Sequence, residues 1–93
     1  MIRRRSGSYQ EMAERRFRHR VDIEVPALGL GQRLTTMLDW CSSNVSPDDW
    51  AQHGYLDMAT ASRPTDYTRF YFACPVIAKI FSRTFNGYLR ERE

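Results

Sequence analysis

Polar and apolar residues alternate over positions 17–25, and this pattern predicts a β-strand with one buried face. The proline that follows ends the strand, because its nitrogen cannot donate a ladder hydrogen bond. The polar face of such a strand is expected to meet water. The apolar positions are Val21, Ile23 and Val25, and the polar positions between them are Arg20, Asp22 and Glu24.

Apolar residues recur at helical spacing in two later stretches. The first predicted helix covers residues 30–42, and the second covers residues 75–85. The second begins at Pro75, a residue tolerated in the first helical turn, and ends at Asn86-Gly87, where the chain can turn through a left-handed conformation. The buried stripe of the first helix is Leu30, Leu34, Met37, Leu38 and Cys41.

Residues 46–58 allow two interpretations. A serine followed by a proline favours a short helical turn, which ends at His53-Gly54 and is followed by a strand over residues 55–58. His53 would then be a surface residue at the end of the turn. The alternative is a single strand over residues 50–58.

Residues 67–74 are dense in aromatic side chains, which fit a pleated surface, and they predict a further strand. A loop over residues 59–65 precedes it, and residues 88–90 form a last short strand. The order is then strand, helix, strand, strand, helix, strand. We expect an α+β protein with a ferredoxin-like two-layer sandwich (βαββαβ), in which one antiparallel sheet carries both helices on one face.

This topology makes two predictions about side chains. The first and third strands become antiparallel neighbours, so that opposite charges on their shared face attract one another. Cys41 and Cys74 are expected to approach each other inside the core as two buried thiols. The shared face of the two strands collects Asp22, Glu24, Tyr67, Arg69 and Tyr71.

The chain has 93 residues, enough for one modest hydrophobic core. We divide it into a basic flexible arm over residues 1–16 and a single α+β domain over residues 17–93. Ser8 and Glu11 have the capping-box spacing, which favours a short helix over residues 9–16. Disorder until contact is the open alternative, because that helix has few apolar residues.

Composition argues against several classes of protein. No apolar run approaches the roughly 20 residues that a membrane helix needs, and no apolar segment follows the N-terminal arginines as in a secretory signal. The two cysteines match no metal or redox spacing. We therefore expect a cytoplasmic protein with no cofactor, no metal and no membrane partner. Arginine dominates its cationic residues, as in proteins from GC-rich bacterial genomes.

Positive charge is concentrated at the N-terminus. Residues 1–20 hold seven arginines against two glutamates, whereas residues 21–93 hold seven cationic and nine acidic residues. A cationic arm can bind phosphates without sequence specificity, so nucleic-acid binding is an alternative function. The simpler interpretation is a solvated leader that aids solubility. The arginines of the arm are Arg3, Arg4, Arg5, Arg15, Arg16, Arg18 and Arg20.

Gly29 and Gly31 stand between a predicted strand and a helix start, where backbone N–H groups can hold an anion. The simpler interpretation is that the two glycines let the chain turn into the helix. The run V-P-A-L-G-L-G-Q-R-L resembles the ligand loop of regulatory amino-acid-binding ACT domains, but the aspartate-then-Pro-Gly entry of those domains is absent. This resemblance implies a second alternative function, a small-ligand sensor at the loop.

The run R-F-Y-F at residues 69–72 resembles the aromatic RNP1 strand of RNA-recognition modules, which would imply base stacking on the open sheet face. Two features argue against it. Asp22 and Glu24 on the same face would repel phosphates. The glycine that RNP1 uses for close approach is also absent, because Tyr71 stands in its place.

No residue pattern predicts catalysis. Cys74 has the better environment of the two cysteines, at a helix N-terminus, but the spacing places no base beside it. We expect a non-enzymatic protein that acts by binding, as a protein-interaction or self-association domain with a protein partner or a second copy. Tyrosine and arginine are favoured at such interfaces. The predicted interface on the open sheet face is Tyr55, Tyr67, Arg69 and Tyr71.

Overall fold

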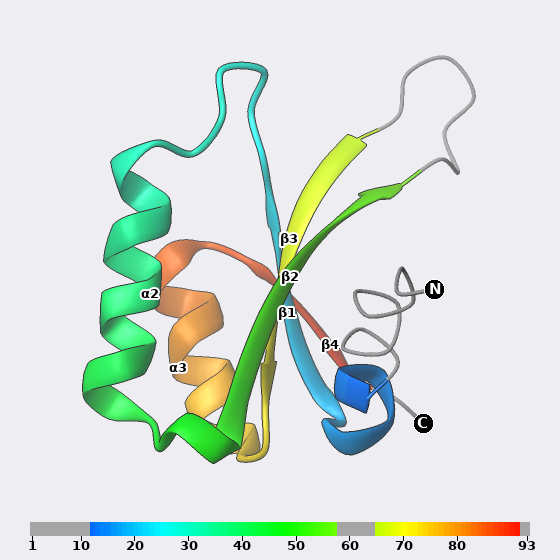
Figure 1. Cartoon of the computed structure of the whole chain (residues 1–93), viewed down its shortest axis with the longest axis vertical. Coiled ribbons are helices and arrows are strands. Elements are labelled where there is room, and N and C mark those ends of the chain that lie inside the picture. Colours follow the sequence, from blue (N-terminus) through cyan, green and yellow to red (C-terminus); the bar gives the residue numbers. More distant parts are fainter. Residues whose placement is uncertain (1–11, 58–64, 92–93) are drawn as a thin grey trace, which may run out of the picture.

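The computed structural model describes residues 12–57 and 65–91 (Figure 1). Residues 12–16, at the start of the first range, are helical. The elements that follow are β1 (His19–Glu24), α2 (Gln32–Asn44), η1 (Pro47–Asp49), β2 (Trp50–Asp57), β3 (Thr65–Phe72), α3 (Pro75–Phe85) and β4 (Tyr88–Glu91). The protein therefore belongs to the α+β class.

The four strands form one antiparallel sheet in the order β2-β3-β1-β4. Figure 1 shows α2 and α3 against one face of this sheet and residues 12–16 beside the opposite face. Asp22 of β1 lies opposite Arg69 of β3, and Val21 lies opposite Phe70. The predicted pairing of the first and third strands is thus confirmed. Val21 and Ile23 are buried as predicted, but the polar face does not meet water at its centre, because Asp22 is also fully buried.

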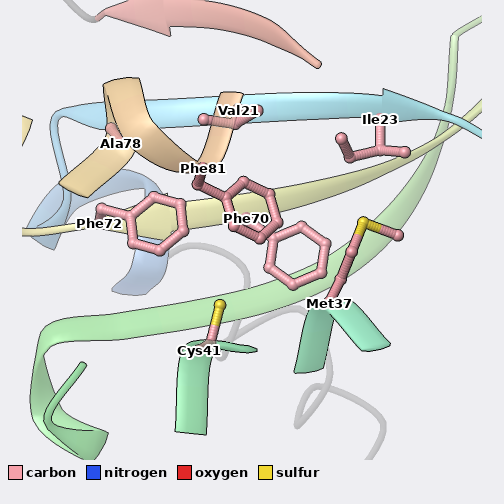
Figure 2. Close-up of a cluster of buried hydrophobic side chains, with 8 residues drawn as sticks. All are labelled: Val21, Ile23, Met37, Cys41, Phe70, Phe72, Ala78 and Phe81. Carbon is pink, nitrogen blue, oxygen red and sulfur yellow. The ribbon is translucent and has the colours of Figure 1, made fainter. Parts of the chain in front are cut away.

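The main core lies between the sheet and the two helices (Figure 2). The ring of Phe81, on α3, has its centroid 4.6 Å from that of Phe70 and 5.1 Å from that of Phe72, both on β3. Phe85 and Trp40 flank the same ring, with centroids 4.8 and 5.4 Å away. Aromatic pairs at these separations attract beyond the effect of buried area alone. Phe81 is therefore the residue through which α3, β3 and α2 are joined.

Both predicted helices are present. α3 spans the predicted residues 75–85; Pro75 is in its first turn, and Asn86 ends it in the left-handed conformation at φ 57°. α2 begins and ends about two residues later than predicted. Its stripe faces the core as expected, because Met37 and Cys41 are fully buried and Leu30, Leu34 and Leu38 pack against them in part.

The favoured interpretation of residues 46–58 was wrong. The helical turn is only η1, and the strand already begins at Trp50, so the single-strand alternative is correct up to Asp57. His53 and Gly54 are strand residues that pair with Arg69 and Thr68 of β3, not the end of a turn. Most of the predicted loop over residues 59–65 lies outside the described residues.

The prediction of two buried thiols holds for one cysteine. Cys41 is fully buried on α2, and burial raises the pKa of its thiol to about 12. Cys74 is exposed, because β3 ends at Phe72 and Cys74 becomes the residue that precedes α3. Within residues 12–57 and 65–91, no helix combines the length and apolar character needed to cross a membrane.

Candidate interaction site

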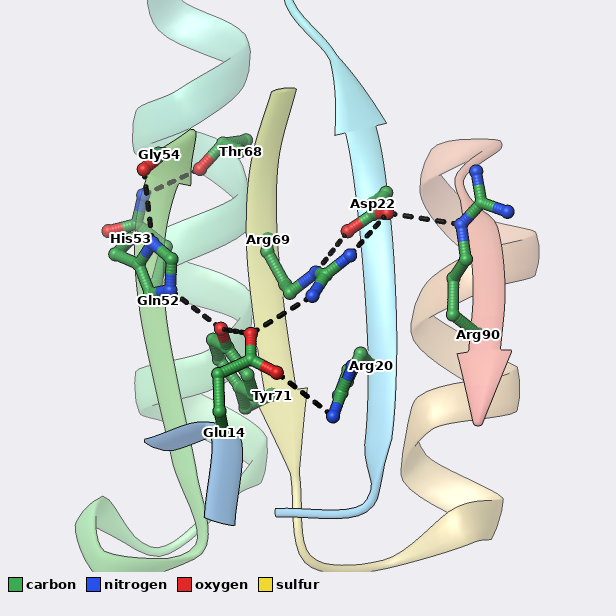
Figure 3. A network of polar contacts seen from close by, with 10 residues as sticks. All are labelled: Glu14, Arg20, Asp22, Gln52, His53, Gly54, Thr68, Arg69, Tyr71 and Arg90. Carbon is green, nitrogen blue, oxygen red and sulfur yellow. Dashed lines mark hydrogen bonds and ion pairs between the residues drawn. The ribbon is translucent and has the colours of Figure 1, made fainter. Parts of the chain in front are cut away.

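A carboxylate is buried on the face of the sheet that lies away from α2 and α3. Asp22, at the centre of β1, is 0% exposed. Its oxygens accept hydrogen bonds from Nε of Arg69 at 2.7 Å and from Nη2 of Arg69 at 3.1 Å (Figure 3). Arg90 on β4 adds a third, from Nε at 3.1 Å. Charge-assisted bonds of this kind are stronger than neutral ones, and they offset the cost of burying the charge.

A second carboxylate joins this arrangement from residues 12–16. One oxygen of Glu14 forms an ion pair with Nη2 of Arg20 at 2.9 Å, and the other accepts a hydrogen bond from Nη1 of Arg69 at 3.0 Å. The hydroxyl of Tyr71 donates to that second oxygen. Nε2 of His53 lies 2.6 Å from the Tyr71 hydroxyl oxygen. We call the set Glu14, Arg20, Asp22, His53, Arg69, Tyr71 and Arg90 the polar cluster.

Tyr71 is not at the surface. The sequence places it on an open face, but its exposed fraction is 0%, because Ala13 and Phe17 pack against its ring. The centroids of the Phe17 and Tyr71 rings are 6.2 Å apart. Burial, followed by the hydrogen bond to Glu14, raises the pKa of the Tyr71 phenol above its ordinary value. This part of the sheet face is therefore covered by the chain itself.

Glu14 stays ionised although it is partly buried. Burial alone would raise the pKa of its carboxyl. The hydrogen bond from Tyr71 and the positive charges of Arg20 and Arg69 outweigh burial and hold that pKa below its ordinary value of 4.5. A carboxyl whose pKa is lowered by folding stabilises the protein above its unfolded-state pKa, and this contribution is lost as the pH falls through the folded-state pKa.

We predict that Glu14→Gln lowers the free energy of unfolding at pH 7, and that the difference from the unmodified chain shrinks as the pH falls below about 4.5. Urea denaturation at several pH values from neutral to acid measures this. Glu24→Gln is the control, because Glu24 is an exposed carboxylate on β1. A Glu14→Gln deficit that stayed constant down to acid pH would contradict the assignment.

A groove runs along the outer strand β2 on the helix side of the sheet. Two cavities form it, with volumes of about 300 and 470 Å³, and Gln52 lines both of them. Their apolar walls come from α2, which places leucines over the strand, and from Trp50 at the start of β2. We call this the α2–β2 groove. Its lining includes Leu30, Leu34, Leu38, Val45, Trp50, Gln52 and Gly54.

One of the residues predicted for a protein interface, Tyr71, is fully buried. Tyr55 and Tyr67 lie opposite each other on β2 and β3. Arg69 and Tyr71 are neighbours on the same face, but both belong to the polar cluster. Tyr67 also lines the larger cavity of the α2–β2 groove.

The arginines predicted to bind nucleic acid are divided. Arg3, Arg4 and Arg5 lie outside the described residues. Arg15, Arg16 and Arg18 are exposed, and Arg16 donates a hydrogen bond to the carbonyl oxygen of Asp48 at 2.7 Å. Arg20 is ion-paired with Glu14.

The predicted ligand loop has its two glycines in the left-handed region, at φ 85° for Gly29 and 57° for Gly31. This is the geometry that the simpler interpretation requires, because residues with side chains rarely adopt it. The larger cavity of the α2–β2 groove borders the loop, since Val25 and Leu30 line it. A small ligand therefore has space beside the loop.

Sequence reasoning missed the α2–β2 groove and the part played by His53. The signal for the groove was available: Leu30, Leu34 and Leu38 recur every four residues, and the last two lie in α2. Among the described residues, no group of three or more His, Cys, Asp or Glu side chains could hold a metal ion. The polar cluster instead consists of paired charges, an arrangement suited to holding segments together or to binding an anion.

Comparison with known proteins adds no assignment. No protein-family model matches the chain, and neither a curated protein nor a solved structure matches it. The function is therefore argued from the geometry of these residues alone.

Proposed function

We propose that the protein is a small interaction domain that associates through the outer edge of β2, either with a second copy or with a strand of another protein. Among the described strands, β2 pairs with β3 alone. The role is binding, not catalysis. The proposal includes a ferredoxin-like arrangement, supported by the order of the elements and by the strand order β2-β3-β1-β4. It also includes a cytoplasmic location, supported by two free cysteines, and a bacterial-type cell, which rests on the predominance of arginine among the cationic residues.

The observation that carries the proposal is an outer strand with an apolar groove beside it. β2 has eight residues and forms one end of the sheet. An edge strand presents N–H and C=O groups with which another chain can pair. Side chains of an incoming strand that point toward the helix layer would enter the α2–β2 groove. Backbone pairing would then supply affinity, and the groove would supply specificity.

The other edge of the sheet is less suited to pairing. β4 has four residues, and Arg90 on it is half exposed and paired with Asp22. Short edge strands and charged side chains are the devices by which proteins protect an edge. Residues 50–56 of β2, by contrast, contain no Asp, Glu, Lys or Arg. The difference between the two edges favours β2.

We predict that Gly54→Lys weakens association by about tenfold or more, because a cation would have to be buried in the groove. The substitution is compatible with the strand, since a Cβ on Gly54 would lie 3.6 Å from the carbonyl oxygen of Tyr67, an ordinary contact. Light scattering over a concentration series measures self-association, and a pull-down with and without the substitution measures binding of a partner.

Gly54→Thr is the matched control, because it adds an uncharged β-branched side chain at the same position and should leave association intact. Equal binding by the Lys and Thr variants would exclude β2 as the site. A strict monomer at high micromolar concentration would exclude the homodimer and leave the partner-protein form.

The larger cavity favours a second candidate, a small-ligand sensor beside Gly29 and Gly31. Its volume of about 470 Å³ is in the range of small-molecule sites. Leu34 supplies an apolar wall, and Gln52 and Thr68 supply polar groups, with Nε2 of Gln52 donating to Oγ1 of Thr68 at 2.6 Å. Thermal-shift screening with amino acids separates this candidate from strand pairing. Nucleic-acid binding by the arm remains a hypothesis.

A further inference from the structure

The polar cluster contains a set of hydrogen-bond donors that converge on one carboxylate. Arg20 on β1 forms an ion pair with one oxygen of Glu14 at 2.9 Å, and Arg69 on β3 donates a hydrogen bond to the other at 3.0 Å. The hydroxyl of Tyr71 on β3 also donates to Glu14 (Figure 3). All three donors thus stand on two neighbouring strands at the centre of the sheet. We call Arg20, Arg69 and Tyr71 the carboxylate cradle.

Two of the three cradle residues, Arg69 and Tyr71, have partners on the sheet besides Glu14. Asp22 binds Nε and Nη2 of Arg69, so the plane of that guanidinium is fixed and its Nη1 is aimed at the cradle. His53 on β2 contacts the Tyr71 hydroxyl through Nε2. Donors fixed before a ligand arrives lose less side-chain entropy on binding, and this favours binding of an anion.

The carboxylate that fills the cradle comes from outside the sheet. Glu14 lies in the helical segment over residues 12–16, and its side chain is 31% exposed, whereas those of Arg20 and Arg69 are 15% and 16% exposed. Packing beneath the segment is incomplete, because a cavity of about 220 Å³ remains where Met12, Ala13 and Phe17 face β2. The Glu14 carboxylate therefore lies closer to solvent than the arginine side chains that bind it, as a ligand does in a site that opens to solvent.

Charge on this face depends on Glu14. The polar cluster contains three arginines and two carboxylates. Without Glu14, one carboxylate would remain, and it is already engaged with Arg69 and Arg90. Arg20, whose printed ion pair is with Glu14, would lose that counter-ion while its side chain is 15% exposed, so the emptied face would attract another anion.

We infer that the carboxylate cradle is a binding site for a carboxylate ligand, which in this structure is filled by the chain's own Glu14. An external carboxylate enters when residues 12–16 lift away from the sheet. A carboxylate is the matching anion, because two guanidinium groups and a hydroxyl meet both of its oxygens. The site lies on the opposite face of the sheet from the α2–β2 groove, so it does not depend on strand pairing.

A tethered carboxylate competes strongly with a free one. A short tether gives Glu14 an effective concentration of about millimolar or more at the cradle. Free acetate should therefore bind the unmodified chain weakly and bind a chain that lacks the Glu14 carboxylate more readily. Weaker acetate binding by the unmodified chain than by the variant is the result expected of a site that is already occupied, and the experiment measures this difference.

The test is the thermal and urea stability of the full-length Glu14→Ala variant, titrated with sodium acetate against sodium chloride of equal ionic strength. Acetate is expected to stabilise the variant in a saturable way, so that at ten times its dissociation constant the folding equilibrium constant rises about elevenfold. Chemical shifts of the His53 ring and Tyr71 should move with the same dissociation constant. The unmodified chain should respond only at concentrations about tenfold higher or more.

The control is Glu14→Ala/Tyr71→Phe, which removes one cradle donor and keeps the aromatic ring against Phe17. Its affinity for acetate should fall about tenfold, because it lacks a hydrogen bond to a charged acceptor. Should Glu14→Ala not fold, Glu14→Ser takes its place with the same expected results, because its short side chain also leaves the cradle empty. Equal effects of acetate and chloride, or equal acetate affinity with and without the Tyr71 hydroxyl, would overturn the inference.

Discussion

Replacing Phe81 by alanine is expected to lower the free energy of unfolding by about 4 kcal/mol. Phe81 is fully buried, and its ring contacts Phe70 and Phe72 on the sheet and Trp40 on α2. The truncated side chain would lose its transfer free energy and leave a cavity that rigid neighbouring rings cannot fill. In a domain of this size the melting temperature should fall by about 20 °C. Urea denaturation and calorimetry measure both quantities.

Val76→Ala is the control on the same helix, because Val76 is 61% exposed and should change the free energy of unfolding by less than about 0.5 kcal/mol. If both substitutions cost the same, the core is not organised around Phe81. A loss of less than about 1 kcal/mol for Phe81→Ala would also contradict this organisation of the core, because removing a fully buried aromatic ring costs several times more.

Asp22→Asn is expected to cost about 3 kcal/mol of folding stability. Asparagine has nearly the same shape as aspartate, so the loss of stability measures the contribution of the negative charge. Arg69 and Arg90 would each lose an ionic partner, and Arg69 would lose it in a mostly buried position. Because Arg69 keeps its bond to Glu14, the cost should fall toward the low end of what is seen for broken buried pairs.

Glu24→Gln serves as the matched control for Asp22→Asn. The two carboxylates occupy the same strand, but Glu24 is exposed, so its substitution should cost less than about 0.5 kcal/mol. Combining Asp22→Asn with Arg69→Met tests whether the cost is that of an unpaired cation. The double variant should be more stable than Asp22→Asn alone, and a further loss would contradict a charge-pairing role for Asp22.

The parts of the fold that the sequence predicted are those in which local pattern and tertiary packing agree. Alternation along β1 identified its buried face, and Pro75 with Asn86 bounded α3 correctly. The pairing of Asp22 with Arg69 followed from two such patterns, because strands placed side by side bring opposite charges onto one face.

The parts that could not be predicted depend on contacts distant in sequence. The local sequence around Gly54 favours the end of a helical turn, yet Gly54 lies within β2. Pairing with β3 along eight residues outweighs this weak local preference. Residues 12–17 look too polar to pack. Two apolar residues, Ala13 and Phe17, are enough to bury Tyr71, since Glu14 adds charge-assisted bonds beside them. No sequence pattern showed that this segment would return to the sheet.

The candidate sites were less predictable than the fold for the same reason. The α2–β2 groove exists because leucines of α2 overhang an edge strand that begins at Trp50, five residues before the favoured prediction. Three of the residues proposed for an open face, Arg69, Tyr71 and Tyr67, are divided between the polar cluster and the groove. Residue types favourable for binding were therefore recognised, but their surroundings were not.

Amide hydrogen exchange along the two edges of the sheet tests the central claim, that β2 is the strand through which the protein associates. Exchange is compared between the free protein at low concentration and the associated state at high concentration or with a captured partner. Amides of Trp50–Asp57 should exchange more slowly in the associated state, while those of Tyr88–Glu91 stay unchanged. Protection of β4, or association with no change in β2, would contradict the account.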